Sequence, residues 1–150
     1  MEIGIYANTH GQAFSDDTDM FLSHTPFEEM RPVKMAKMAE DSGFHSIWYP
    51  DHVCMPIQSG SAHTANVSGK RAYQPYHNML DMAVVMGAVA VSTSRIKLGT
   101  SVLIAPYRHP LSDARQFGTV DLLSNGRLML GVGSGWMQEE FAAVGQSHEV

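Results

Sequence analysis

The sequence has one cysteine, few charged residues and no hydrophobic run long enough to span a bilayer. With Cys54 alone, no disulfide can form within the chain, and such cysteine usage favours the reducing cytosol, so we expect a cytoplasmic protein. The longest apolar run, 82–91, has ten residues, whereas a membrane-spanning helix needs about 20. The first four residues lack the basic start and apolar core of a signal peptide. We therefore expect no membrane partner.

Clusters of basic residues are also missing. Ten Lys and Arg against fifteen Asp and Glu give 10 − 15 = −5, and this mildly acidic balance argues against a nucleic-acid partner. The eight histidines show no metal-ligand spacing such as H-x-x-x-H, so we expect no metal site. What the chain does have is apolar surface: 44% of its residues are hydrophobic, which predicts a folded globular domain.

Strand-like and helix-like segments alternate along the chain. Continuous apolar runs predict strands buried on both faces at 3–7, 46–49, 96–104 and 128–132. Helical patterns between them predict helices at about 31–42, at 78–93 with Asn78 as N-cap, and from Pro110 to Asn125, with a further helix starting at 137–144. The helix at 78–93 is apolar nearly all round, so we expect it to be largely buried. This alternation predicts an α/β fold with a parallel sheet.

One segment interrupts the pattern of short connections. Residues 50–77 are rich in Ser, Gly, His and Gln and show no periodic apolar pattern. A loop of this length inside a compact domain is typical of an active-site lid or a binding loop.

Polar residues and glycines gather where the predicted strands end. Asp51 and His52 follow the second strand, Ser101 lies within the third, and Ser134 and Gly135 follow the fourth. Ligands of parallel α/β proteins bind beyond the carboxyl ends of the strands, so these residues are candidates for a site. His52 could exchange protons near neutral pH with Asp51 orienting it. Equally, Asp51 could cap the loop while His52 packs beneath it.

The glycine-rich segment 131–135 also has two interpretations. It could let backbone amides approach a ligand, or it could be a tight strand-to-helix turn, and by itself the turn is the favoured interpretation. A dinucleotide-binding fingerprint would need a third glycine at the position of Trp136.

Several motifs together resemble those of one enzyme family. Residues 43–52, 96–103, 124–127, 131–136 and 139–141 resemble, in order and spacing, motifs of the luciferase-like oxidoreductases, above all members that use the deazaflavin coenzyme F420. The resemblance implies a (β/α)₈ TIM barrel that binds FMN or coenzyme F420 and acts on a small-molecule substrate. Such a barrel needs about 250 residues. We therefore expect residues 1–150 to be the N-terminal half, about the first four βα units, with the C-terminal half absent from this chain.

The same resemblance implies roles for individual residues. His52 matches a histidine that serves as acid or base, and so is the candidate catalytic residue. The candidate cofactor-binding residues are Asp51, Ser101, Val102, Ser134 and Gly135, with a non-prolyl cis peptide bond between Ser101 and Val102.

The sequence departs from the family's sugar-phosphate dehydrogenase branch at two positions. Trp136 replaces a carboxylate and Ile104 replaces a hydroxyl residue, which argues against glucose 6-phosphate as substrate.

The sequence therefore predicts a luciferase-like oxidoreductase, either an FMN-dependent monooxygenase or an F420-dependent enzyme of hydride transfer. Two alternatives come from other classes. The first is a Rossmann-type dinucleotide-binding module, against which Trp136 argues. The second is a non-catalytic half-barrel, which would bind neither cofactor.

The first testable prediction concerns association. Half a barrel would expose the inner face of its sheet and two strand edges, and both features favour contact with another chain. We expect the 150-residue chain to form a homo-oligomer, measurable as its mass by light scattering. A stable monomer that unfolds cooperatively would contradict this expectation.

Overall fold

The computed structural model describes residues 1–7, 9, 30–62 and 79–148. Its strands are β1 (Gly4–Tyr6), β2 (Ser46–Tyr49), β3 (Lys97–Ile104) and β4 (Leu128–Gly133). Its helices are α2 (Pro32–Asp41), α3 (Met82–Ser92), α4 (Pro110–Ser124) and α5 (Gln138–Ala143), with a 3₁₀ turn η1 (Ala105–Tyr107) after β3. The four strands lie in the order β1-β2-β3-β4 and all pairs are parallel. The predicted parallel α/β fold is confirmed.

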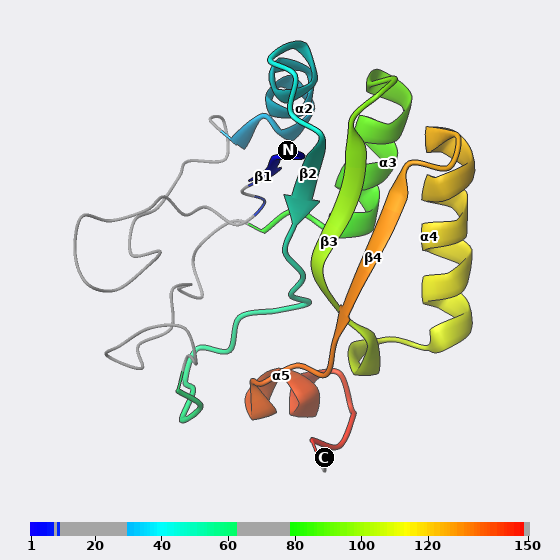
Figure 1. Cartoon of the computed structure of the whole chain (residues 1–150). Coiled ribbons are helices and arrows are strands. Elements are labelled where there is room, and N and C mark those ends of the chain that lie inside the picture. The colour runs from blue at the N-terminus through cyan, green and yellow to red at the C-terminus, as the bar shows by residue number, and fades with distance from the viewer. Residues whose placement is uncertain (8, 10–29, 63–78, 149–150) are drawn as a thin grey trace, which may run out of the picture.

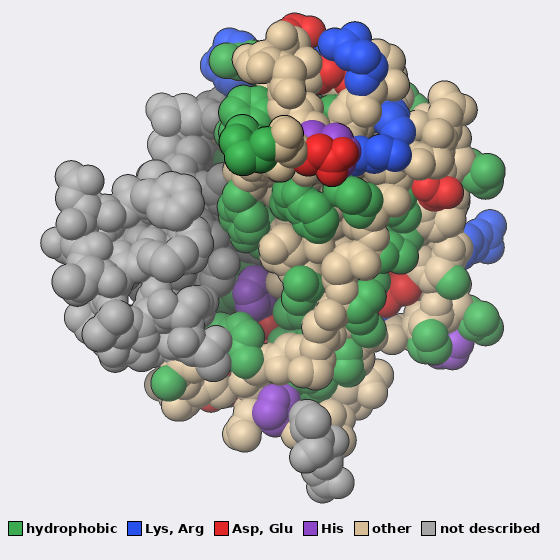
Figure 2. Space-filling model, viewed as in Figure 1, with side chains coloured by type: hydrophobic (Ala, Val, Ile, Leu, Met, Phe, Trp, Pro, Cys, Tyr) green, Lys and Arg blue, Asp and Glu red, His purple; other side chains and the backbone are tan. Residues whose placement is uncertain are grey.

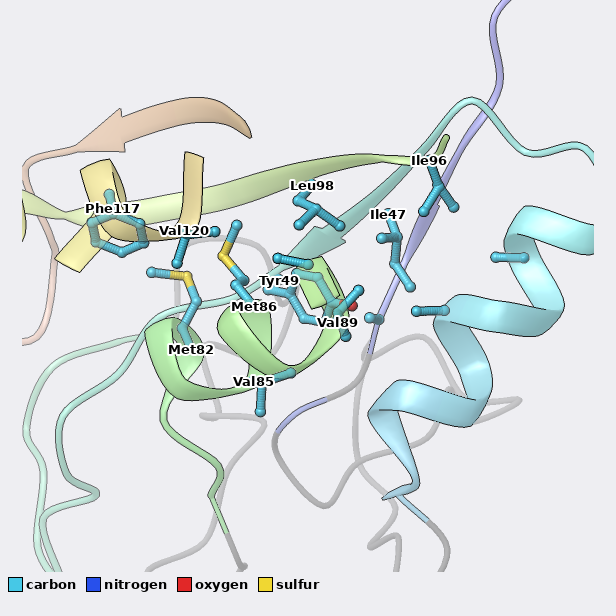
Figure 3. Packing of buried hydrophobic residues seen from close by; sticks show 14 of the residues in the cluster. Ile47, Tyr49, Met82, Val85, Met86, Val89, Ile96, Leu98, Phe117 and Val120 are labelled. Carbon is cyan, nitrogen blue, oxygen red and sulfur yellow. The ribbon is translucent and has the colours of Figure 1, made fainter. Parts of the chain in front are cut away.

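Three helices cover one face of the sheet, while α5 lies beyond the carboxyl ends of the strands (Figure 1). The main core fills the space between the sheet and these helices (Figure 3). Ile47, Tyr49 and Leu98 project into it from β2 and β3, and α3 supplies Met86 and Val89. Because Ile47 and Tyr49 alternate with Ser46 and Trp48 along β2, only every second residue of this strand faces the helices.

The opposite face of the sheet is shaped by Trp48. A Cβ atom at Gly99 would lie 2.3 Å from the Trp48 ring, and one at Gly4 would lie 2.6 Å from its Nε1 atom. Glycines at these two positions therefore let the indole lie across its neighbours β1 and β3, while Nε1 donates a hydrogen bond to Ser46 Oγ. Hydrophobic side chains are spread over the viewed surface of the molecule, as Figure 2 shows.

Helix α3 differs from its prediction in two ways. It begins at Met82 with Asp81 as N-cap, whose Oδ1 accepts a hydrogen bond from the Val84 amide at 2.9 Å, so the predicted start at Asn78 is wrong. A carboxylate at this position accepts a hydrogen bond from a backbone amide that has no acceptor within the helix. Such a cap contributes about 1 kcal/mol to stability. The helix is also only half buried, because Val84 and Val91 are 72% and 65% exposed.

The amino end of β3 is held by a carboxylate from α2. Glu40 accepts hydrogen bonds from the backbone amides of Ser94, Arg95 and Ile96, at 2.6–3.2 Å. Burial opposes ionisation of Glu40, but these three donors outweigh it and lower its pKa from 4.5 to about 2. The contact thus ties α2 to the residues that start β3, across 54 or more positions of sequence.

The pKa of Glu40 generates a prediction about pH. Because its pKa in the folded state is below the unfolded value, the stability it contributes is complete above about pH 4.5 and is lost as pH falls through about 2. We expect Glu40→Gln to lower the free energy of unfolding at pH 7, and by a smaller amount at pH 3, measured by chemical denaturation. Asp41→Asn, at the exposed neighbour, is the control. An equal loss at both pH values would contradict the prediction.

Candidate active site

A cavity of about 280 Å³ opens at the carboxyl ends of the strands. Its walls come from β1, from the segment after β2, from β3 and from the turn after β4, and the residues that line it are Tyr6, Pro50, Asp51, His52, Ser101, Val102, Ile104, Gly135 and Trp136. Five of the six predicted site residues line this one cavity; Ser134 is exposed and is not among the lining residues. Four separate segments of the chain thus converge where the sequence predicted a site.

A larger cavity of about 550 Å³ lies between α2 and β1. Methionines 30, 35 and 38 line it, and among the described residues in its walls none is His, Asp, Glu or Cys. It offers no group that could exchange a proton with a ligand near neutral pH. The smaller cavity at the strand ends is therefore the better candidate for chemistry.

Asp51 joins the ends of β2 and β3. Both of its carboxylate oxygens accept hydrogen bonds from the Arg108 guanidinium at 2.7 Å, and Oδ2 also accepts one from the Ile104 amide at 3.0 Å. These bonds to Asp51, opposed by burial, raise the pKa of Arg108 above its usual value. A bidentate pair of this kind fixes geometry as well as charge. Asp51 thus fixes the wall of the cavity next to His52.

The ring of His52 is held by Glu140 of α5. Nδ1 of His52 lies 2.7 Å from Oε2 of Glu140, and both side chains are almost completely buried. Glu140 Oε2 also accepts a hydrogen bond from the Tyr107 hydroxyl at 2.9 Å. On the other oxygen, Oε1 accepts from the Val53 amide at 2.5 Å and the Cys54 amide at 3.2 Å. One carboxylate therefore contacts four polar groups, which belong to the segment after β2 and to the turn after β3.

These contacts shift the pKa values around Glu140. Burial raises the pKa of Glu140, but the hydrogen bond and charge of His52, with the donors Val53 and Tyr107, lower it overall. Burial and the adjacent carboxylate raise the pKa of the Tyr107 hydroxyl, which stays a donor at neutral pH. The same two causes raise the pKa of the Cys54 thiol, which does not favour a nucleophilic thiolate.

The neighbouring Glu139 holds the same loop farther along. Its Oε1 accepts hydrogen bonds from the amides of Gly60 and Ser61 at 2.5 and 3.2 Å, and Oε2 accepts one from Ser61 Oγ at 2.8 Å. The Ser61 hydroxyl, with these amides, lowers the pKa of Glu139 to about 2 against a smaller effect of burial. Two adjacent glutamates thus anchor the described part of the predicted insertion, 50–62; its remainder, 63–77, lies outside the described residues.

The peptide bond between Ser101 and Val102 is cis, as the family resemblance implied. The pairing of β3 with β4 shifts register between Thr100 and Leu103, around this bond. Thr100 Oγ1 donates to the Gly131 carbonyl at 2.8 Å and accepts from the Gly131 amide at 2.9 Å, which joins the two strands where the ladder is interrupted. Val102 itself is 41% exposed at the cavity.

Two glycines, one at the end of β4 and one after it, are explained by contacts within the protein. A Cβ atom at Gly133 would meet Val102 at 2.6 Å. Gly135 has φ of +83°, and a Cβ atom there would lie 2.8 Å from Ile104 and 2.9 Å from the Phe141 ring. These distances favour a tight turn, the interpretation preferred from the sequence.

The lining residues suit a planar ring system better than a phosphate. Val102, Ile104 and Trp136 supply apolar and aromatic surface, and among the described residues that line the cavity none is Lys or Arg. A volume of about 280 Å³ is near the lower end of ordinary ligand pockets, which run from about 300 to 1,000 Å³. The cavity thus fits the ring part of a flavin or deazaflavin. Among the residues that the structure describes, no group of three His, Cys, Asp or Glu side chains could hold a metal ion.

Sequence reasoning missed the partners of the predicted residues. Arg108 and Tyr107 carried no motif, and Glu140 stood out only as part of the run 139–141. Their partners lie 33 to 88 positions away in sequence. A possible signal was that all three follow predicted strands, as Asp51 and His52 do.

Comparisons with known proteins agree on one family. A family model described as luciferase-like monooxygenase matches residues 1–150. The chain is 37% identical over 115 residues to an F420-dependent glucose-6-phosphate dehydrogenase of Amycolatopsis mediterranei, an alignment that covers 76% of this chain and 30% of that protein. The chain spans 39% of the length of the first relatives it matches, which are uncharacterised proteins of mycobacteria.

Solved structures of luciferase-like TIM-barrel enzymes share the fold. The coenzyme F420 dependent tetrahydromethanopterin reductase from Methanopyrus kandleri is 28% identical, with a TM-score of 0.55 over 96% of this chain and 30% of its own. The oxygenating constituent of 3,6-diketocamphane monooxygenase of Pseudomonas putida, solved in complex with FMN, is 18% identical with a TM-score of 0.61, covering 97% and 32%. At 18% identity the likeness shows the fold alone.

Of the helices that the structure describes, none has the length and hydrophobicity to cross a membrane.

The pair formed by Asp51 and Arg108 generates a prediction about stability. Removing one partner of a buried ion pair leaves the other charge uncompensated. Since the Arg108 side chain is 20% exposed, we expect Asp51→Asn to cost about 2–4 kcal/mol of unfolding free energy, somewhat less than for a fully buried pair. Chemical denaturation measures this loss. Arg115→Gln, on the exposed face of α4, is the control and should change stability by less than about 0.5 kcal/mol. Equal effects of the two variants would show that the pair contributes nothing specific.

Proposed function

The chain belongs to the luciferase-like monooxygenase family, and on this premise we propose that it forms part of an oxidoreductase whose cavity at the strand ends receives the ring of FMN or coenzyme F420 beside a small organic substrate. The observation that carries the proposal is the convergence of His52, the Ser101–Val102 bond and Trp136 on one cavity. His52 follows β2, Ser101 and Val102 lie within β3, and Trp136 follows β4.

The residues that would hold the ring are those with exposed apolar or backbone surface in the cavity. Val102 and Ile104 on β3 and Trp136 after β4 would pack against it, with Ser101 and Gly135 presenting backbone. The resemblance implies that Asp51 contacts the cofactor. It would do so from the same wall of the cavity while it remains paired with Arg108. When bound, the flavin or deazaflavin supplies the redox chemistry.

The protein's own contribution is orientation, exclusion of water and proton exchange. Among the described residues that line the cavity, His52 is the one whose side chain ordinarily gains and loses a proton near neutral pH. Its ring is almost completely buried, so bulk water competes little for its proton. We assign His52 as the acid or base of the reaction.

Of the two cofactors, we favour coenzyme F420 and therefore hydride transfer. The named relative that shares 37% identity depends on F420, and a second, the F420-dependent hydroxymycolic acid dehydrogenase of Mycobacterium tuberculosis, shares 34%. The departures at Trp136 and Ile104 from the sugar-phosphate dehydrogenase branch argue against glucose 6-phosphate as the substrate.

Architecture is part of the proposal. We propose that residues 1–150 are the N-terminal half of a TIM barrel, and that residues supplied by a C-terminal half bind the phosphate of the cofactor. In support, the solved barrels match this chain over about a third of their own length.

Cofactor binding is the first test. The full-length protein, titrated separately with FMN and with F420, should change the absorbance spectrum of one of them, F420 by preference, with saturation. The change should be absent with bovine serum albumin as control. A protein that alters neither spectrum would support the non-catalytic half-barrel instead.

His52 carries a separate prediction. In the full-length enzyme, His52→Ala should lower turnover by about 10²–10⁴-fold, the usual range for a general acid or base, with little change in cofactor affinity. His45→Ala is the control, because His45 lies at the opposite end of β2, half-exposed and near Glu2. Steady-state kinetics and spectral titration measure the two effects. If turnover persists while cofactor binding collapses, His52 packs against the cofactor and exchanges no proton.

A further inference from the structure

Glu140 can only accept hydrogen bonds from the groups around it. Its lowered pKa and its burial among donors keep it an ionised carboxylate at neutral pH. The amides of Val53 and Cys54 and the hydroxyl of Tyr107 donate to it. An ionised carboxylate has no proton to give. The short contact at 2.7 Å to Nδ1 of His52 therefore requires that Nδ1 carry a proton.

This requirement decides between the two neutral forms of the imidazole. A neutral histidine has one N–H and one acceptor nitrogen, and the hydrogen bond that one nitrogen makes sets the role of the other. With its proton held on Nδ1, neutral His52 has its acceptor at Nε2. A second proton is then taken up at Nε2, which makes the ring positively charged, while the hydrogen bond from Nδ1 to Glu140 persists.

We propose that Glu140 is a positioning residue that keeps the proton of His52 on Nδ1, so that His52 exchanges protons with substrate or cofactor through Nε2 alone. The inference rests on the proposed function for its catalytic meaning. The tautomer itself is inferred from the contacts of Glu140 with His52, Val53, Cys54 and Tyr107 and needs no cofactor or substrate.

A single substitution, Glu140→Gln, should move the proton of neutral His52 to the other ring nitrogen. In Glu140→Gln, the side-chain carbonyl must face Val53 and Cys54, since their backbone amides can only donate. The amide nitrogen then faces Nδ1 of His52 and the Tyr107 hydroxyl. Because an amide nitrogen donates, Nδ1 must accept, and the proton of neutral His52 moves to Nε2.

Glu139→Gln is the matched control. Glu139 lies on the same helix, undergoes the same change of carboxylate to amide, and holds the same loop through Gly60 and Ser61. Within the described part of the chain, the Glu139 carboxylate accepts hydrogen bonds from Gly60 and Ser61, whereas His52 contacts Glu140. Any effect that comes merely from loosening the loop should appear in both variants, whereas an effect on the tautomer should appear only in Glu140→Gln.

The test is nitrogen NMR of the His52 ring, with signals assigned by their loss in His52→Ala. Where the His52 ring is neutral, the wild type and Glu139→Gln should show a protonated Nδ1 and an unprotonated Nε2, and Glu140→Gln should show the reverse. A wild-type ring with its proton on Nε2 would overturn the proposal. This measurement on the wild type tests the proposal even if Glu140→Gln fails to fold. An unchanged tautomer in a folded Glu140→Gln protein would also overturn it.

Kinetics of the full-length enzyme separate the inference from the function on which it rests. Glu140→Gln should lower kcat by about 10²–10⁴-fold, as expected when the catalytic imidazole is in the wrong tautomer, with cofactor affinity nearly unchanged. Glu139→Gln should stay within about threefold of the wild type, an effect typical of a surface contact. If His52→Ala retains turnover while the NMR shows the expected tautomers, the assignment of His52 as the acid or base fails and the assignment of Glu140 to the tautomer holds.

Discussion

The buried carboxylate of Glu140 is the interaction on which the carboxyl-end architecture depends. It lies on α5, after β4, yet it binds the segment that follows β2 through His52 and Val53, and the turn that follows β3 through Tyr107. Three strand ends are thus joined by one side chain. A buried charge is tolerated only when donors surround it, so the position of each donor is set by the need to satisfy that charge.

Two charged side chains perform a different task at the amino end of β3. Glu40 accepts from the backbone amides of the turn before β3. Arg127 is buried and donates to the carbonyls of Ala90, Thr93 and Ile96, where α3 ends and β3 begins. These contacts fix helices against the sheet and involve none of the cavity residues. Buried charges therefore hold the fold together at both ends of the sheet, and only those at the carboxyl ends also shape the candidate site, as is typical of parallel α/β folds.

The elements that could be predicted from sequence are those with a local cause. Runs of apolar residues place β2 at 46–49 and β4 to within one residue of its end. The expectation that the strands are buried on both faces is wrong for β4, where Leu130 and Val132 are 50% and 61% exposed. Pro110 and Asn125 bound α4 as expected. The start of α3 was missed because Asp81 and Asn78 are both good caps, and only the hydrogen bond to Val84 distinguishes them.

By itself, the sequence determined the parallel α/β fold, the family and the convergence of Asp51, His52, Ser101, Val102 and Gly135 at the strand ends, since all of these follow from local patterns and the geometry of parallel strands. Only the tertiary structure decided the partners: Arg108 for Asp51, 57 positions away, and Glu140 for His52, 88 positions away. It also placed Ser134 outside the cavity lining. The reason is physical. A carboxylate accepts hydrogen bonds from any suitable donor that lies close enough. Which donors lie close enough depends on how β2, β3 and β4 pair side by side in the sheet, not on the residues next to the carboxylate in the chain.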